Sequence, residues 1–166
     1  MNFRMAVLED IEQVCDLVRL SIIHMEQQHI FQWDEIYPAR EDFIKDIHNG
    51  ELFVGQLNGN IAVIYTINKR CEKEYQNGQW NNPNCEYRII HRLCVHPDLQ
   101  NQGLAKATLF YIEEQLRAMK VDAIRLDVFS KNPAALALYS NCGYKKTGYA
   151  DWRKGRFFLM EKSLFK

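Results

Sequence analysis

The amino-acid sequence predicts an α+β fold in a single domain that covers residues 1–166. Three observations support this prediction. Apolar residues at helical spacing and alternating strand patterns are mixed along the whole chain. Hydrophobic residues make up 47% of the sequence, enough to build one core without disulfides or metal. No internal repeat, low-complexity tract or linker divides the chain.

Charge and cysteine content narrow the class of protein. Lys and Arg together number 21, as do Asp and Glu, so no basic excess points to nucleic acid, and a small-molecule ligand is favoured. The five cysteines form no CxxC and suit neither a disulfide framework nor a zinc site. The charged N-terminus and the absence of an apolar run of about 20 residues predict a cytoplasmic protein without a membrane span.

In the first part of the chain, apolar spacing predicts a helix from Leu8 to about Gln28 and a shorter one across Glu41 to His48. The segment between them, "HIFQWDEIYP", is rich in aromatic residues and has no period. Two apolar runs then flank Asn58-Gly59 in "ELFVGQLNGNIAVIYTI", which is the strongest short signal for a β-hairpin.

The second part of the chain begins with a polar segment, Asn68 to Asn84, that reads as a long loop. A strand is predicted from Tyr87 to Val95, a helix through Leu109 to Met119, and another strand at "AIRLDVF". The final segments "GYKKTGYA" and "FFLMEKSLF" predict an antiparallel hairpin around Lys154-Gly155.

The segment "KNPAALALYSNCGY" carries its own helix signals. Asn132 suits the N-cap, Pro133 suits the first helical position, and Gly143 suits the left-handed position that follows a helix. A helix of about ten residues is therefore predicted here.

The amide-rich stretch Gln100 to Ala105 lies between the end of a strand and the start of a helix. Backbone N–H groups at a helix N-terminus have no intrahelical partner and suit phosphate oxygens, and Gly103 lets the backbone come close. Neither G-x-x-x-x-G-K-[ST] nor G-x-G-x-x-G is present, which disfavours ATP and dinucleotides. Taken alone, the stretch is equally consistent with a plain helix start.

Together, "HRLCVHPDLQNQGLAKATL" and "NPAALALYSNCGYKKTG" resemble the GNAT acyltransferase superfamily. Its pyrophosphate loop reads Gln/Arg-x-x-Gly-x-Gly/Ala after a Val-x-Pro strand end, and Ala105 stands where many relatives have Gly. The resemblance implies a mixed, mostly antiparallel sheet of about seven strands with helices on both faces. It also implies transfer of an acetyl group from acetyl-CoA to a primary amine of a small molecule or peptide, by direct attack in a ternary complex.

The resemblance also implies a set of cofactor contacts. The backbone of Leu93 and Val95 would pair with the pantetheine arm, and Asn132 would lie near the cofactor. Lys106 either meets a phosphate or is a solvated helix lysine. The backbone amides that would hold the pyrophosphate of acetyl-CoA belong to Gln100, Asn101, Gln102, Gly103, Leu104 and Ala105.

The reaction needs a route for a proton, because an amine with a pKa of about 10.4 is mostly protonated at neutral pH. His91 is the candidate base: alternation places it on the face of Leu93 and Val95, although a purely structural histidine is the alternative. Glu86 competes from the start of the strand, on the opposite face unless a bulge changes the register. Tyr139, which the resemblance places beside the thioester sulfur, is the candidate acid for the departing thiolate.

Trp33 and Tyr37 are candidates for the acceptor pocket, because the family usually builds that wall from this connection; packing of the loop onto the core is the alternative. No histidine spacing suits a metal, and Cys94 and Cys142 read as core thiols rather than nucleophiles. A catalytically idle acyl-CoA-binding sensor is the rival function, which the presence of Tyr139 disfavours. The sequence leaves the acceptor and the oligomeric state open, a homodimer included.

Overall fold

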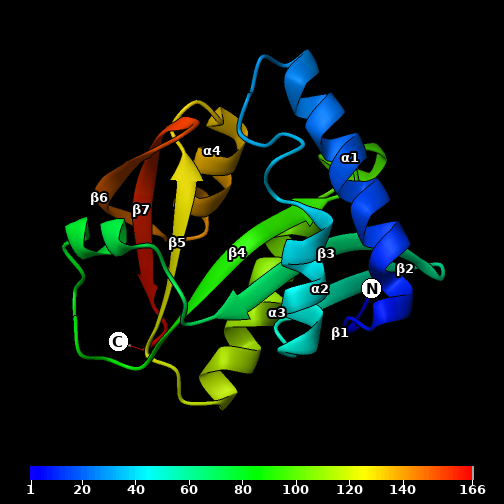
Figure 1. The fold of residues 1–166 in the computed structure, drawn as a ribbon. Helices are drawn as coiled ribbons and strands as arrows, with labels where there is room; N and C mark the ends of the chain where they lie inside the picture. The colour runs from blue at the N-terminus through cyan, green and yellow to red at the C-terminus, as the bar shows by residue number, and fades with distance from the viewer. Residues whose placement is uncertain (166) are drawn as a thin grey trace. The chain divides into compact units, whose positions relative to one another are not determined.

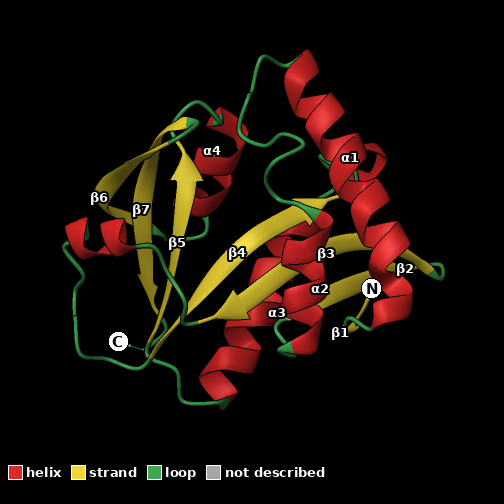
Figure 2. Ribbon diagram, viewed as in Figure 1, coloured by secondary structure: helices red, strands yellow, loops and turns green. Residues whose placement is uncertain are grey.

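The computed structural model describes residues 1–165, and Figures 1 and 2 show its helices and strands. The strands are β1 (Asn2–Met5), β2 (Leu52–Leu57), β3 (Asn60–Asn68), β4 (Tyr87–Val95), β5 (Ala123–Phe129), β6 (Lys145–Trp152) and β7 (Gly155–Ser163). The α-helices are α1 (Ile11–Gln27), α2 (Arg40–His48), α3 (Leu104–Ala118) and α4 (Pro133–Asn141). Short 3-10 helices are η1 (Leu8–Asp10), η2 (Lys73–Asn77) and η3 (Pro97–Leu99).

The seven strands belong to one sheet in the order β1-β2-β3-β4-β5-β7-β6. Strand β4 pairs with β5 in parallel, whereas the pairs β1–β2, β2–β3, β5–β7 and β6–β7 are antiparallel. The predicted α+β fold with a mostly antiparallel sheet of seven strands is therefore confirmed.

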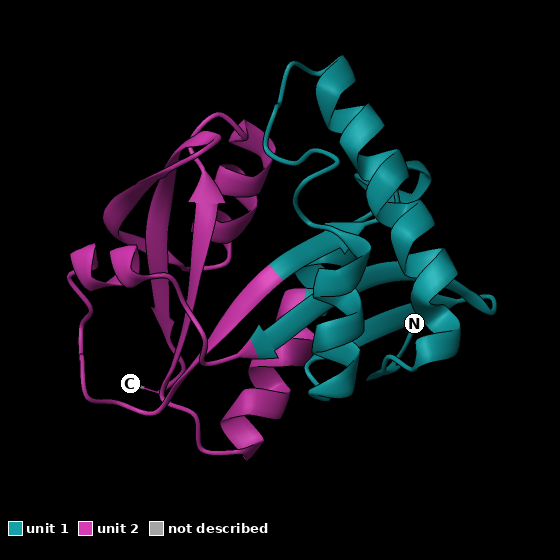
Figure 3. Ribbon diagram, in the orientation of Figure 1, with its two compact units in different colours: residues 1–67, 92–108 teal, residues 68–91, 109–166 magenta. Residues whose placement is uncertain are grey.

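The chain divides into two compact units, coloured separately in Figure 3. The first comprises residues 1–67 and 92–108, and the second comprises residues 68–91 and 109–166. Both β4 and α3 contribute residues to each unit. The assignment of residues 1–166 to one domain stays a prediction.

The first unit confirms the N-terminal hairpin and helices. Asn58 and Gly59 have φ angles of 52° and 82°, the left-handed pair that a tight turn between β2 and β3 requires. The apolar stripe of α1 lies in a core with side chains of α2, β2 and β3. Buried members of this core are Val14, Leu17, Val18, Trp33, Phe43, Leu52, Val54, Ile61 and Ile64.

In the second unit, β5 pairs with β7 along its whole length, and β6 and β7 form the predicted closing hairpin. Helix α4 begins and ends where the sequence predicts. At its start, the Asn132 side-chain oxygen accepts the Ala135 N–H at 3.1 Å and Pro133 is the first helical residue; after its end, Gly143 has a φ of 90°.

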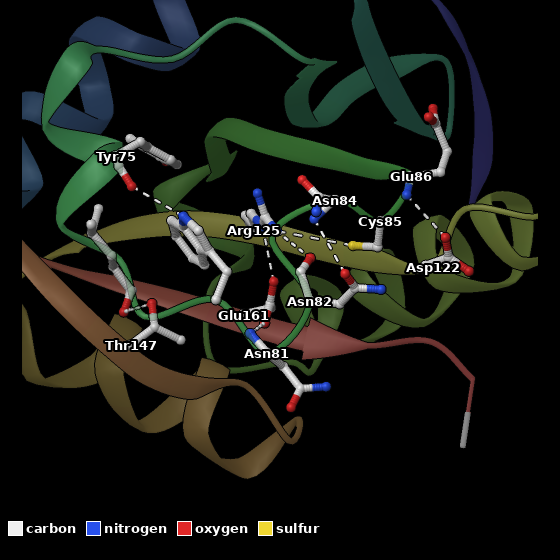
Figure 4. Close-up of polar contacts among 12 residues, drawn as sticks. Tyr75, Asn81, Asn82, Asn84, Cys85, Glu86, Asp122, Arg125, Thr147 and Glu161 are labelled. Carbon is white, nitrogen blue, oxygen red and sulfur yellow. Dashed lines mark hydrogen bonds and ion pairs between the residues drawn. The ribbon is translucent and has the colours of Figure 1, made fainter.

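The polar segment before β4 is a loop with one 3-10 helix, η2, and is held by buried charges (Figure 4). Arg125 of β5 donates from Nε to Glu161 at 2.9 Å and from Nη2 to the Asn82 carbonyl at 3.1 Å. Its guanidinium lies 4.4 Å from the ring centre of Trp80 and 4.0 Å from that of Tyr87. A polar segment can be ordered in this way because its backbone finds charged partners in the strands.

None of the helices in residues 1–165 combines the length and apolar content needed to cross a bilayer. Within the same residues, no group of three or more His, Cys, Asp or Glu side chains is arranged to hold a metal ion.

Candidate active site

The connection from β4 to α3 is a turn with two left-handed residues. The ring of His96 accepts the Asp98 N–H at 3.3 Å through Nδ1 and so caps η3. Asn101 and Gly103 then have φ angles of 60° and 79°. The first helical hydrogen bond runs from Ala107 N to Gly103 O at 2.9 Å, so the amides of the preceding helical residues have no partner inside α3.

Gly103 is required by backbone conformation rather than by crowding. A Cβ built at this residue would meet no atom within 4 Å, yet its φ of 79° is one that side chains other than glycine rarely adopt. The turn therefore has open space at the positive end of the α3 dipole. Such space beside helix-terminal amides suits an anionic group.

The amide side chains of this turn bind carbonyl groups of residues that precede it. Gln100 Nε2 donates to the Val95 carbonyl at 3.2 Å, and Gln102 Nε2 donates to the Asp98 carbonyl at 3.4 Å. These side-chain hydrogen bonds were not predicted from the sequence, which indicates only backbone contacts with phosphate for both residues. The Gln100 side chain fixes the turn to the end of β4, and the Gln102 side chain fixes it to η3, which favours the backbone as the anion-binding surface.

Strand β4 is irregular where the sequence predicts regular alternation. Its parallel pairing with β5 covers Tyr87 to Ile89 and stops before Leu93 and Val95. Arg92 has a φ of 51°, a left-handed conformation inside a strand. The alternation that placed His91 on the face of Leu93 and Val95 is therefore interrupted.

The two base candidates differ in their surroundings. His91 is half-buried, and its Nε2 lies 2.9 Å from Asn68 Oδ1. Because an amide oxygen only accepts hydrogen bonds, His91 Nε2 is the donor in this contact. Glu86 is exposed, and its hydrogen bonds with Lys69 and then Arg88 hold its pKa below the ordinary value. A carboxylate held in this way is a weaker base.

Tyr139 of α4 is buried in the second unit with 9% of its surface exposed. Its ring centre lies 5.6 Å from that of Tyr144 in an edge-to-face arrangement of 73°. This packing fixes the ring independently of what its hydroxyl contacts. Asn132, the other α4 candidate, uses its side-chain oxygen as the helix cap.

The two candidates for the acceptor pocket, Trp33 and Tyr37, lie in different environments. Trp33 is buried in the core of the first unit with 8% of its surface exposed, which favours the packing role. Tyr37 is 42% exposed and accepts a hydrogen bond from Arg92 Nη1 at 2.8 Å. Arg92 itself was missed by the sequence analysis, because nothing in its local spacing indicates these partners.

A model of the Acetyltransferase (GNAT) family matches residues 10–144 of the chain. The chain belongs to the GNAT family of acetyltransferases. Over 166 residues it is 26% identical to S-(2-succino)cysteine N-acetyltransferase of Bacillus subtilis, and the matched region covers 98% of this chain and 96% of that protein. The prediction that the chain is an N-acetyltransferase of this family is confirmed.

Solved structures of acetyltransferases share the fold. One from Streptococcus agalactiae superposes with a TM-score of 0.85 at 24% identity, covering 99% of this chain and 96% of that one. The structure of yncA from Salmonella typhimurium, described with its cofactor acetyl-CoA, has a TM-score of 0.71 at 16% identity and covers 100% of this chain and 95% of that one.

The thiol of Cys94 in this GNAT chain is a core group. It is buried, with 8% of its surface exposed, and donates to Ser21 Oγ at 3.0 Å; burial raises its pKa to about 12. We expect native protein treated with iodoacetamide at pH 8 to be modified at the exposed Cys71 and to leave Cys94 unmodified, as peptide mass spectrometry would reveal. Rapid modification of Cys94 would instead support a role for this thiol as a nucleophile, which the sequence disfavours.

Proposed function

We propose that this GNAT enzyme transfers an acetyl group from acetyl-CoA to a primary amine of a small molecule or peptide, by direct attack in a ternary complex. The observation that carries this proposal is the left-handed turn before α3, where Gly103 leaves open space beside the helix-terminal amides. That arrangement suits a pyrophosphate.

We assign the cofactor contacts as follows. Backbone amides from Asn101 to Ala105 bind the pyrophosphate, and Lys106 adds charge at the start of α3. The Gln100 N–H, predicted to join them, donates instead to the Pro97 carbonyl at 3.2 Å. Backbone groups of Leu93 and Val95 bind the pantetheine arm; their position beyond the β4–β5 pairing supports this role. Asn132 lies near the cofactor, as its match to the family motif implies.

In the proposed reaction, the amine lone pair attacks the thioester carbonyl carbon, the C–S bond breaks, and the nitrogen loses a proton. His91 accepts that proton directly or through water, and Tyr139 donates to the departing thiolate. Glu86 is the weaker candidate base because its pKa is lowered by Lys69 and Arg88. Tyr37 forms part of the acceptor side.

His91→Ala is the test of the base. A histidine that must be neutral to act gives kcat/KM an acidic limb, because protonation at low pH removes the base. We expect His91→Ala to lower kcat/KM and to flatten that limb in a pH series with acetyl-CoA saturating. A variant with a lower Tm but an intact acidic limb would identify His91 as a structural residue.

An acceptor screen tests the overall function. Acetyl-CoA would be incubated with spermidine, L-methionine, kanamycin, an alanine-terminated peptide and S-(2-succino)cysteine, and free thiol release measured. The last compound is included because the Bacillus subtilis relative is named for it. We expect release with at least one amine. Tight binding of acetyl-CoA without release for any amine would instead support the idle sensor.

A further inference from the structure

Arg92 occupies an unusual place in β4. It is a residue other than glycine in the left-handed region, with a φ of 51°, in the middle of a strand. A backbone of this kind costs free energy and persists only where surrounding contacts hold it. The side chain of Arg92 is 11% exposed, so those contacts are in the interior of the first unit.

The guanidinium of Arg92 joins two segments that are distant in sequence. Its Nη2 pairs with the carboxylate of Asp46 in α2, and its Nη1 donates to Tyr37 Oη at 2.8 Å. Asp46 is itself 4% exposed and also accepts the Thr66 hydroxyl of β3 at 2.8 Å. The guanidinium lies 5.8 Å from the ring centre of Phe43 and 5.9 Å from that of Tyr37.

This arrangement depends on the shape of arginine. A planar fork can donate to two partners in fixed directions, whereas a lysine ammonium is a compact point charge that cannot reproduce both bonds. The buried Nε of Arg92 has no hydrogen-bond partner among residues 1–165, which adds to the cost of burying this charge. A buried ion pair is a weak source of stability compared with apolar packing of equal volume.

Tyr37 is the exposed end of this cluster. Arg92, Asp46, Phe43 and Thr66 are largely buried, whereas Tyr37 is 42% exposed. The cluster therefore fixes the position of one exposed aromatic residue relative to β4. The guanidinium of Arg92, which pairs with Asp46, faces the Tyr37 ring, because its Nη1 donates to the Tyr37 hydroxyl.

We propose that Arg92 is a positioning residue for the acceptor: it holds Tyr37 in place and thereby sets the KM for the amine. This inference rests on the proposed function, in which Tyr37 belongs to the acceptor side. Arg92 acts through Tyr37 and makes no contact with the reacting atoms.

A double-mutant cycle tests the proposal with Arg92→Lys, Tyr37→Phe and the combined variant. Arg92→Lys keeps a cation for Asp46 but loses the fork, and Tyr37→Phe removes only the hydroxyl that accepts from Arg92. Arg40→Lys is the matched control, because it makes the same change in an exposed pair with Glu12 in the same unit. Kinetics would use acetyl-CoA and the amine of the above panel with the fastest thiol release.

We expect each single variant to raise the amine KM by about tenfold, as loss of a hydrogen bond to a charged group does, with little change in the acetyl-CoA KM. In the combined variant, Arg92→Lys should add little to Tyr37→Phe, because both remove the same bond. Additive effects, or a change in the acetyl-CoA KM alone, would overturn the proposal.

Hydrogen exchange gives a second measurement that needs no acceptor. The N–H groups of Ile36 and Tyr37 donate to Asp34 Oδ1 at 3.0 and 3.1 Å. They should exchange faster in both single variants than in the parent or in Arg40→Lys. Unchanged exchange would overturn the positioning role. If the parent releases no thiol with any panel amine, the proposed function fails and the acceptor role of Arg92 fails with it. If the parent is active but the effects of the two substitutions are additive, only the positioning role of Arg92 is refuted.

Discussion

Gly103→Glu is expected to abolish binding of coenzyme A. The substitution places a side chain and a negative charge in the open space beside the first amides of α3. It also forces a residue other than glycine into a φ of 79°, which costs about 1–2 kcal/mol for L-residues. Repulsion between carboxylate and pyrophosphate is the larger effect on binding.

Isothermal titration calorimetry with coenzyme A gives the direct measurement. We expect affinity to fall at least about 100-fold, which corresponds to about 2.8 kcal/mol. Unchanged affinity in a folded Gly103→Glu variant would show that the turn before α3 does not hold the pyrophosphate.

Gly59→Glu is a matched control for this experiment. Gly59 has a φ of 82°, and a Cβ there would also meet nothing within 4 Å, but it lies in the turn between β2 and β3. The same charge and the same backbone strain are thus introduced outside the proposed site. This variant should lose comparable stability and bind coenzyme A as the parent does.

Tyr139→Phe is expected to lower kcat by about 100-fold or more while coenzyme A affinity changes little. The aromatic ring, which packs edge-to-face against Tyr144, is retained in phenylalanine. The proton that the hydroxyl would give to the departing thiolate is lost. Steady-state kinetics with saturating acetyl-CoA, combined with calorimetry, separates the two effects.

Tyr144→Phe is the control for Tyr139→Phe. The Tyr144 hydroxyl donates to Glu113 at 3.3 Å, and Glu113 is also paired with Lys162 at 2.7 Å. Its loss should cost about 1 kcal/mol of stability, or roughly 2–4 °C in Tm, with kcat near that of the parent. Parent-like turnover in Tyr139→Phe would show that this residue is not the general acid.

The sequence by itself determined the features that depend on neighbouring residues. The Asn58-Gly59 turn, the Asn132 cap of α4 and the left-handed Gly143 all follow from conformational preferences that act within a few residues. The turn before α3 was predicted for the same reason: an amide-rich stretch with Gly103 precedes an apolar helical pattern. The family motif extended these local signals to a fold of about seven strands.

Tertiary structure decided which side chains meet across the sequence. Arg92 contacts Tyr37 and Asp46, which lie 55 and 46 residues away, and no spacing in the sequence indicates such pairs. The left-handed backbone conformation at Arg92 could not be predicted from the sequence either, because an arginine gives no signal for it. The burial of Trp33 was also decided by tertiary structure. An aromatic residue in a segment without a period suits a pocket or a core alike, and only the packing of α1, α2 and the strands around Trp33 excludes water from it.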